Sequence, residues 1–198
     1  MKTYVATRNA GKLKEMREIF AGSMLDLQTF PAYRDVPETA NSYVGNALIK
    51  AHALTRQLFD AGIEAAVLSD DSGLEVDVLS GRPGVLSARY AGEETTWTKR
   101  RQALLGELDG LAEAERTARF VCVMALIVPG HEPLTSIGTV EGRIVSQERG
   151  GGGFGYDPLF LYPPSGCTFA ELSAEEKNRV SHRRRAADAL LATLHTRV

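Results

Sequence analysis

The chain has 198 residues and a formal net charge of −2, and 43% of its residues are hydrophobic and 24% charged. This length fits one domain over residues 1–198, and the near-neutral charge excludes a global basic field for nucleic acid. No run approaches the roughly 20 apolar residues that span a bilayer, and the apolar run near the N-terminus is too short for a signal peptide. The two cysteines, Cys122 and Cys167, are too few for a disulfide framework. We therefore expect a soluble cytoplasmic protein with no nucleic-acid or membrane partner.

The N-terminal part of the chain predicts one strand followed by two helices. Residues 3–7 form a short apolar run that is typical of a strand. Residues 11–20 place apolar side chains on one helical face, and residues 42–59 repeat that spacing over a longer helix.

The rest of the chain mixes strands with helices. Residues 65–69 are an apolar run that suits a buried strand, and residues 75–79 alternate like a second strand closed by turn residues. A helix over residues 95–108 and an antiparallel pair of strands over residues 119–128 and 136–147 follow. The chain finishes in a helix with an apolar face made of Ala187, Leu190, Leu191 and Leu194. Because strands and helices do not alternate strictly, we predict an α/β fold with a mixed β-sheet.

The first candidate site lies at the junction between the first strand and the first helix. Free backbone N–H groups and the positive end of the helix dipole favour anions there. Thr7 and Asn9 add polar side chains, Gly11 allows close backbone approach, and Lys12 supplies a positive charge. The alternative is an ordinary helix cap with a solvated lysine, and this segment alone leaves both interpretations open.

The second candidate site is acidic. Asp70 and Asp71 follow an apolar run, and ligands of open α/β sheets gather at strand ends. In extended backbone the two side chains point to opposite sides, so only one should enter a given site. Magnesium needs only one or two carboxylates when a triphosphate supplies other oxygens, and Glu38 is a candidate second acid. The alternative is a solvated Asp-Asp turn and an exposed loop acid.

The third candidate site is the glycine-rich segment from Gly150 to Pro158. Glycine loses more backbone entropy on ordering than any other residue, so a merely structural loop rarely needs so many. Close approach of a ligand to the backbone would explain them, with Phe154 as a face on which a purine can stack. The alternative is a flexible linker, against which the aromatic, proline-closed ending argues.

A basic segment precedes the last helix. Ser173 and Glu176 have the spacing of a capping box, and Ser181 is a candidate cap for the final helix. His182 and Arg183 would then lie in the first turn, where cations oppose the helix dipole. A local rule broken without visible compensation often marks function. The alternative is a basic surface patch.

Together these segments resemble the inosine triphosphate pyrophosphatase family, which removes inosine and xanthosine triphosphates from the nucleotide pool. Seven segments in the family's order carry the resemblance over most of the length. They are Thr7-x-Asn9-x-x-Lys12, Glu38-Thr39, Asn46-Ala47-x-x-Lys50-Ala51, Ser69-Asp70-Asp71-Ser72-Gly73-Leu74, Gly81-x-Pro83-Gly84-Val85-x-Ser87-Ala88-Arg89-Tyr90, Gly152-Gly153-Phe154-Gly155-Tyr156-Asp157-Pro158 and Glu176-Lys177-x-x-x-Ser181-His182-Arg183.

The resemblance implies an elongated mixed β-sheet flanked by helices, with an active-site cleft between two lobes, and a homodimer. It implies hydrolysis of ITP, dITP and XTP to the monophosphate and pyrophosphate, which keeps these nucleotides out of DNA and RNA. The reaction would be attack of water on the α-phosphorus, assisted by Mg²⁺.

The resemblance also implies roles for individual residues. Asp71 would be the proton acceptor and a magnesium ligand, and Glu38 a second magnesium ligand. The triphosphate would bind at Thr7, Arg8, Asn9, Ala10, Gly11 and Lys12. The other nucleotide contacts would be Ser72, Phe154, Gly155, Tyr156, Asp157, Lys177, His182 and Arg183.

One departure from the family pattern concerns the metal end, where Gly45 stands in place of a frequent glutamate. Any role of that acid would fall to Glu38 and Asp71. Two other classes of function compete with the resemblance. A nucleotide sensor without catalysis would not need these two acids, and a pyrophosphatase for pyrimidine or standard nucleotides would not need the donor-rich segment from Lys177 to Arg183.

Overall fold

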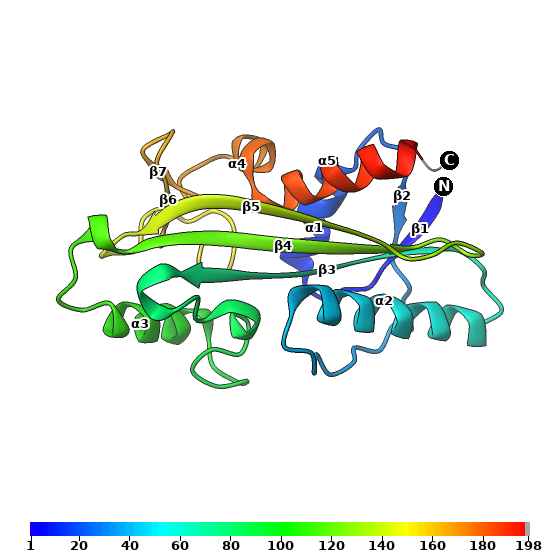
Figure 1. Ribbon diagram of the computed structural model, residues 1–198, viewed down its shortest axis with the longest axis horizontal. Coiled ribbons are helices and arrows are strands. Elements are labelled where there is room, and N and C mark those ends of the chain that lie inside the picture. Colours follow the sequence, from blue (N-terminus) through cyan, green and yellow to red (C-terminus); the bar gives the residue numbers. More distant parts are fainter. Residues whose placement is uncertain (197–198) are drawn as a thin grey trace. The chain divides into compact units, whose positions relative to one another are not determined.

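The computed structural model describes residues 1–196, in which a seven-stranded sheet is accompanied by five α-helices. The strands are β1 Lys2–Val5, β2 Asp26–Gln28, β3 Ala66–Val76, β4 Thr117–Ile127, β5 Leu134–Ile144, β6 Phe160–Tyr162 and β7 Cys167–Thr168. The helices are α1 Ala10–Ile19, α2 Tyr43–Asp60, α3 Trp97–Glu107, α4 Ala174–Val180 and α5 His182–His195 (Figure 1). No helix of this described part is long and apolar enough to cross a membrane.

The sheet is mixed, as the sequence predicts. Its strand order is β2-β1-β3-β4-β5-β6-β7. β1 pairs in parallel with both β2 and β3, with Tyr4 opposite Gln28 and Val67. At the other edge, β6 pairs antiparallel with β5 and with β7. The predicted α/β class with a mixed sheet is therefore confirmed.

The chain divides into two compact units, and the boundaries between them fall inside β3, β4 and β5. Unit 1 consists of Met1–Asp71, Cys122–Gly138 and the final segment from Arg183. Unit 2 consists of Ser72–Val121 and Thr139–His182.

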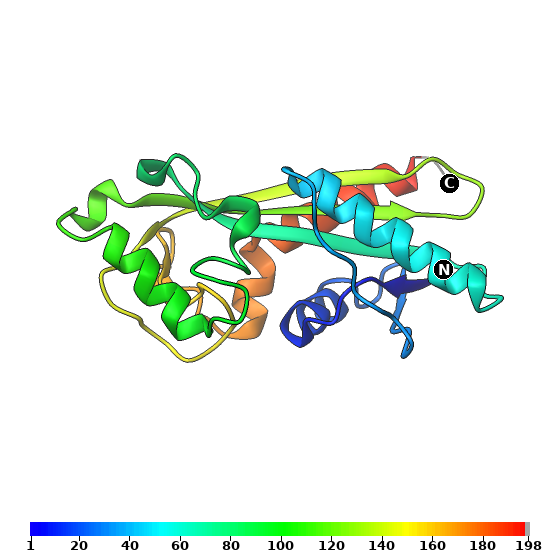
Figure 2. The same cartoon turned by 90° about the horizontal axis from the view of Figure 1, so that it is seen from below.

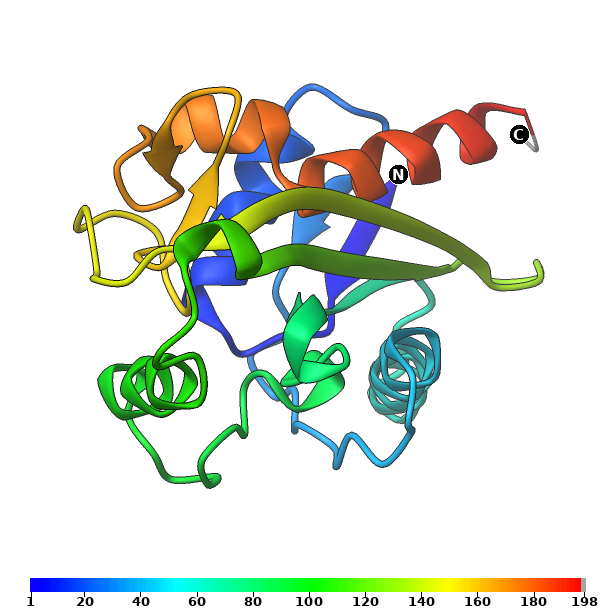
Figure 3. The same ribbon diagram turned by 60° about the vertical axis from the view of Figure 1, so that its left-hand side comes forward.

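Unit 1 has helices on both faces of its strands, because successive side chains of a strand point to opposite sides. Cys122, Met124 and Leu126 of β4 belong to a core with residues of α1 and α5. The alternate residues Val123 and Ala125, with Ile127, belong to a second core with residues of α2. Figure 3 shows α1 and α5 on one side of these strands and α2 on the other.

The final helix confirms the predicted apolar face. Ala187, Leu190 and Leu194 are buried in the core shared with α1, and Leu191 packs partly against it.

Unit 2 has one core, which is rich in aromatic side chains. Leu104 and Leu108, at and just after the end of α3, pack with residues of β3, β4 and β5. The rings of Phe120 and Phe169 stack with centroids 5.8 Å apart, and Phe160 lies tilted against both. Figure 2 shows α3 along one side of this unit.

One prediction about the strands is wrong. Residues 65–69 and 75–79 are not two strands, because β3 runs without interruption from Ala66 to Val76. The residues that follow β3, Asp77–Leu79, form a 3₁₀ helix instead of continuing the strand. The carboxylates of Asp70 and Asp71 do not end the strand, because both side chains are buried and paired with cations. A polar pair in mid-strand resembles a turn when its partners are unknown.

Candidate active site

The predicted phosphate loop is also a helix cap. Asn9 is the N-cap of α1, and its side-chain oxygen accepts a hydrogen bond from the backbone N–H of Lys12 at 3.1 Å. The Thr7 hydroxyl accepts one from the N–H of Asn9 at 3.2 Å. Arg8, Asn9 and Ala10 are exposed, so the backbone at this helix start is accessible to an anion. The capping alternative is correct for Asn9, and it leaves the anion site available.

Lys12 is not a solvated lysine. Its side chain is 15% exposed, and its Nζ lies 3.2 Å from Oδ2 of Asp70. The same carboxylate receives the guanidinium of Arg183, whose Nη2 is 3.0 Å from Oδ2. Arg183 also pairs with Glu15 of α1. Asp70 therefore joins α1 to the start of α5 through buried charges.

The charges around Asp70 fix its ionisation. Burial by itself would raise the pKa of Asp70. The positive charges of Lys12, Arg183 and Lys50 outweigh burial and hold the pKa well below its ordinary range. Asp70 is thus a permanently charged group that orients cations, and it has the wrong pKa for a proton acceptor near neutral pH.

The ion pairs of Arg183 with Glu15 and Asp70 therefore offset the unfavourable position of a cation at the start of α5. The cost of a cation in the first turn is small beside two ion pairs in a buried environment. Its predicted contact with the nucleotide stays a prediction.

Asp71 points to the other side of β3, as predicted for neighbouring residues of a strand. Its Oδ2 accepts a hydrogen bond from the Asn46 amide at 3.1 Å, and its Oδ1 lies 3.4 Å from Nζ of Lys50. Nζ of Lys50 also contacts Oε1 of Glu38 at 2.6 Å. The neighbouring Ser69 hydroxyl donates to the carbonyl of Ala47 at 2.6 Å, which anchors this side of the strand to α2.

Asp71 and Asp70 also differ in pKa. Burial raises the pKa of Asp71 above its ordinary value, and the opposing effects of Lys50 and Lys12 do not cancel it. A raised carboxylate pKa suits a proton acceptor, because base strength increases with pKa. Of the two neighbouring acids, the structure therefore favours Asp71 for the chemistry.

Lys50 remains charged in this environment. Burial by itself would lower the pKa of Lys50. The carboxylates of Asp71, Asp70 and Glu38 outweigh burial and raise the pKa above its ordinary value. The ammonium group therefore places a fixed positive charge beside both candidate metal ligands.

Glu38 and Asp71 fit a magnesium ion that is bound together with a triphosphate. Their carboxylate oxygens are ligands that magnesium prefers. Within residues 1–196 no group of three or more His, Cys, Asp or Glu side chains is arranged to hold a metal. A cation at Glu38 and Asp71 would therefore need oxygens from water and substrate.

Asn46 and Lys50 belong to this site, although neither was among the predicted site residues. Asn46 is 0% and Lys50 7% exposed, and both lie on the buried stripe of α2 with Ala47, Ala51 and Leu54. Asn46 also accepts a hydrogen bond from the backbone N–H of Ala40 at 2.9 Å, in the segment that carries Glu38. The signal was present in the sequence, since two polar residues four apart interrupt an apolar helical stripe.

Gly45, which stands where the family often has a glutamate, lies in a crowded position. A Cβ atom at Gly45 would lie 2.5 Å from the Cβ of Ala40 and 3.0 Å from the hydroxyl oxygen of Ser42. The side chains of Ala40 and Ser42 therefore occupy the space that a side chain at position 45 would need.

The predicted base contacts of unit 2 form a compact group. The Asp157 carboxylate accepts a hydrogen bond from the backbone N–H of Phe154 at 2.7 Å and forms a buried ion pair with Lys177. Nζ of Lys177 lies over the Phe154 ring, 5.0 Å from its centroid. The Tyr156 hydroxyl donates to the carbonyl of Ser87.

The glycines of this loop have reasons other than ligand approach. A Cβ at Gly150 would overlap the backbone of Ala170, and one at Gly153 would overlap the Asp157 carboxylate. Gly153 and Gly155 both adopt φ +67°, in the left-handed region. At these positions the protein's own atoms or the backbone conformation already favour glycine, and the close approach of a ligand to this backbone stays a prediction.

The two remaining predicted contacts also lie in unit 2. The His182 ring stacks on Phe120 with centroids 4.8 Å apart, and His182 is 4% exposed. Ser72 follows Asp71 in β3 and is partly buried. Unit 1 thus holds the predicted phosphate and metal residues with Arg183, and unit 2 holds the others.

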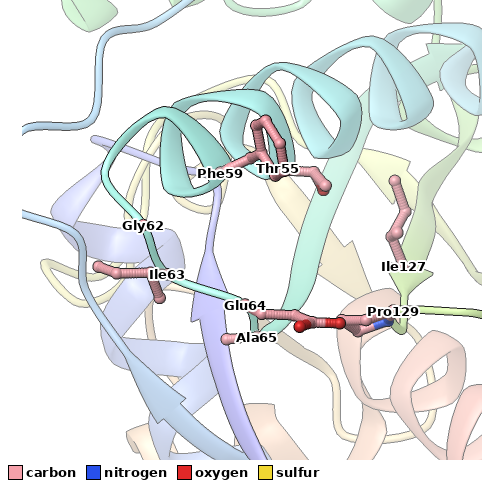
Figure 4. A pocket seen from close by; sticks show the side chains of 8 residues that line it. All are labelled: Thr55, Phe59, Gly62, Ile63, Glu64, Ala65, Ile127 and Pro129. Carbon is pink, nitrogen blue, oxygen red and sulfur yellow. The ribbon is translucent and has the colours of Figure 1, made fainter.

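A cavity of about 440 Å³ lies elsewhere in unit 1, at the C-terminal end of α2. Figure 4 shows its lining, which is mostly apolar and includes Phe59, Ile63 and Ile127. None of the predicted site residues lines it. Asn46 and Phe59 are separated along α2 by roughly 20 Å at 1.5 Å per residue, so this cavity is separate from the candidate active site.

Comparisons with known proteins identify the family. The model of the Ham1 family matches residues 3–193. A dITP/XTP pyrophosphatase of Geobacillus kaustophilus is 46% identical over 94% of this chain and 90% of its own. The structure of the Staphylococcus aureus Ham1 protein has a TM-score of 0.85 at 36% identity and covers both chains completely. A structure titled nucleoside-triphosphatase / dITP/XTP pyrophosphatase from Mycobacterium abscessus has a TM-score of 0.73 at 41% identity, over 96% of this chain and 99% of that one.

The fold and the carboxylate–lysine arrangement thus occur in a chain that belongs to the Ham1 family. The resemblance stated from the sequence motifs is confirmed.

Proposed function

We propose that this chain hydrolyses non-standard purine nucleoside triphosphates, namely ITP, dITP and XTP, to the monophosphate and pyrophosphate. The enzyme class is confirmed by its relatives, because curated proteins that share 42–46% of its residues over nearly its whole length are dITP/XTP pyrophosphatases. This full-length identity is the observation that carries the substrate class. The products and the mechanism are argued from the residues of the site.

Asp71 is proposed as the proton acceptor for the attacking water. Its raised pKa strengthens it as a base, while Asn46 and Lys50 hold its two oxygens. The water oxygen would form a bond to the α-phosphorus as its proton passes to Asp71. The bond from the α-phosphorus to the bridging oxygen would break, and pyrophosphate would leave.

The cations of unit 1 would neutralise the triphosphate. Lys12 lies at the start of α1, where exposed backbone N–H groups and the helix dipole also favour an anion. Glu38 and Asp71 would hold Mg²⁺, which when bound would offset charge on the phosphate oxygens. Lys50 keeps both carboxylates in place through its contacts at 2.6 and 3.4 Å.

The residues of unit 2 are proposed to recognise the base. Phe154 offers an aromatic face, and Lys177 and His182 supply hydrogen-bond donors. Hypoxanthine and xanthine carry a 6-oxo group that accepts hydrogen bonds, whereas the 6-amino group of adenine donates. An adenine base would therefore direct a donor at these donors, which a site built to hydrogen-bond a 6-oxo group rejects strongly.

A nucleotide panel tests the proposal. The protein should be incubated with Mg²⁺ and with ITP, dITP, XTP, GTP, ATP and dUTP, and pyrophosphate and orthophosphate should be assayed separately. We expect equal amounts of inosine monophosphate and pyrophosphate from ITP, and weaker discrimination against GTP, which shares the 6-oxo group, than against ATP. Stepwise release of orthophosphate would contradict the proposed bond cleavage.

The homodimer and the cytoplasmic location implied by the family resemblance stay predictions. Sedimentation of the purified protein tests the former.

A further inference from the structure

Helix α3 holds the loop of residues 150–157 through a partly buried arginine, Arg101. Nη1 of Arg101 donates a hydrogen bond to the carbonyl oxygen of Gly155 at 2.9 Å. Nε of the same side chain lies 2.8 Å from Oε1 of Glu148, just ahead of the loop. The Arg101 side chain is only 13% exposed. One guanidinium therefore links α3 both to Glu148, just ahead of the loop, and to Gly155 within the loop. Figure 2 shows this loop beside α3.

Trp97, at the start of α3, packs against the same part of the loop. Its ring meets Tyr156 edge-on, with centroids 5.4 Å apart and planes at 82°. A Cβ at Gly155 would lie 3.6 Å from the ring, so indole and loop backbone are in close contact. Arg100 lies over the Trp97 ring at 5.2 Å and donates to the backbone carbonyls of Gly92 and Glu93. Arg100 therefore also holds the indole ring of Trp97 in place.

These contacts between α3 and the loop have a physical consequence for ligand binding. Gly153 and Gly155 give the peptide on each side of Phe154 more conformational freedom than other residues would. A loop with that freedom loses entropy when a base binds to it, unless other contacts have already ordered it.

We infer that Trp97 and Arg101 clamp the Phe154 loop and act as positioning residues for base recognition. This inference rests on the proposed function and adds to it two residues that belong to none of the seven family motifs. Because Trp97 is the only tryptophan of the chain, its fluorescence reports on the clamp.

The test replaces Arg101 by methionine, which keeps the length of the side chain and removes its donors. Lys99→Met is the matched control, because Lys99 is an exposed cation on the same helix. We expect Arg101→Met to raise the KM for ITP about tenfold at nearly constant kcat, the size expected for one charge-assisted hydrogen bond. Amide hydrogen exchange at residues 153–157 should become about tenfold faster. Arg101→Lys should restore part of both.

Two further measurements separate the clamp from a loss of folding and from the proposed function. ITP should change the Trp97 emission of the wild type and of Lys99→Met, and Arg101→Met should need about tenfold more ITP for the same change. Unaltered hydrogen exchange at 153–157 in Arg101→Met would overturn the clamp, and so would faster exchange with an unaltered KM. A wild type that hydrolyses no nucleotide of the panel would instead overturn the proposed function, while hydrogen exchange would still decide whether the loop is clamped.

Discussion

In unit 1 the central candidate side chains are charged groups that neutralise one another on regular elements, whereas in unit 2 four of them lie on a glycine-rich loop beside aromatic rings. Asp70, Asp71 and Lys50 project from a strand and a helix whose backbones are fixed by hydrogen bonds. The loop that carries Phe154 and Asp157 contains glycines with positive φ, and its Tyr156 packs against Trp97.

The difference predicts how substitutions will act. Removing a charge in unit 1 changes the ionisation of its neighbours, so turnover and pH dependence should respond. Removing a contact in unit 2 changes the order of a loop, so KM and base selectivity should respond with less effect on kcat.

The largest effect is expected for Asp71→Asn. This change removes the proposed base and a negative charge but keeps the shape of the side chain, and general-base catalysis contributes about 10²–10⁴-fold. Steady-state kcat for ITP should fall by that factor. Asp60→Asn, in an exposed pair with Arg56, is the control.

Asp70→Asn sharpens the assignment of the base. It leaves Arg183 with less compensation in a buried environment, so it should lower the melting temperature more than Asp71→Asn does. At a temperature where both variants are folded, its loss of kcat should be smaller. Equal losses of kcat in the two variants would contradict the division of roles.

Phe154→Ala tests the other side of the comparison. Stacking of a base on an aromatic ring contributes about 1–3 kcal/mol, so the KM for ITP should rise by roughly 5- to 150-fold. Phe154→Tyr keeps an aromatic face and should retain most of the affinity. A fall in kcat with an unchanged KM would place Phe154 outside the base contact.

Lys50→Met should shift the pH profile. The positive charge of Lys50 lowers the pKa of Asp71, so its removal should raise that pKa further. Because the carboxylate must be unprotonated to accept a proton, the acid limb of kcat/KM should move to higher pH. Lys50→Arg keeps the charge and should keep the limb near its original position.

The smallest effect concerns Gly45. Gly45→Ala adds a Cβ that would lie 2.5 Å from Ala40, and overpacking of this kind costs about 1–3 kcal/mol, less the roughly 1 kcal/mol gained in helix propensity. Thermal unfolding should show a loss of about 1 kcal/mol. Gly45→Glu should raise the half-saturating Mg²⁺ concentration instead of lowering it, because the backbone that carries Glu38 must move. Tighter Mg²⁺ binding in Gly45→Glu would show that the space can open.

Local patterns in the sequence were enough for the mixed sheet, the family and the helices α1, α2, α3 and α5. The spacing of apolar residues marks α2 and α5 because one face of each helix is buried, and the capping box at Ser173 needs only neighbours three residues apart. The motifs likewise named the acids and the glycine-rich loop before any contact was known.

Only the tertiary structure decided what each of these residues touches. The sequence could state that Asp70 and Asp71 diverge, but which of them meets Lys12 and Arg183 depends on how α1 and α5 pack on β3. Lys50 and Asn46 enter the site because α2 covers the opposite face, 21 and 25 residues away in the chain from Asp71. The tertiary structure likewise decided that β3 is continuous and that positions 150 and 153 require glycine. Buried charges and close backbone contacts are satisfied by partners distant in sequence, and no local pattern records those partners.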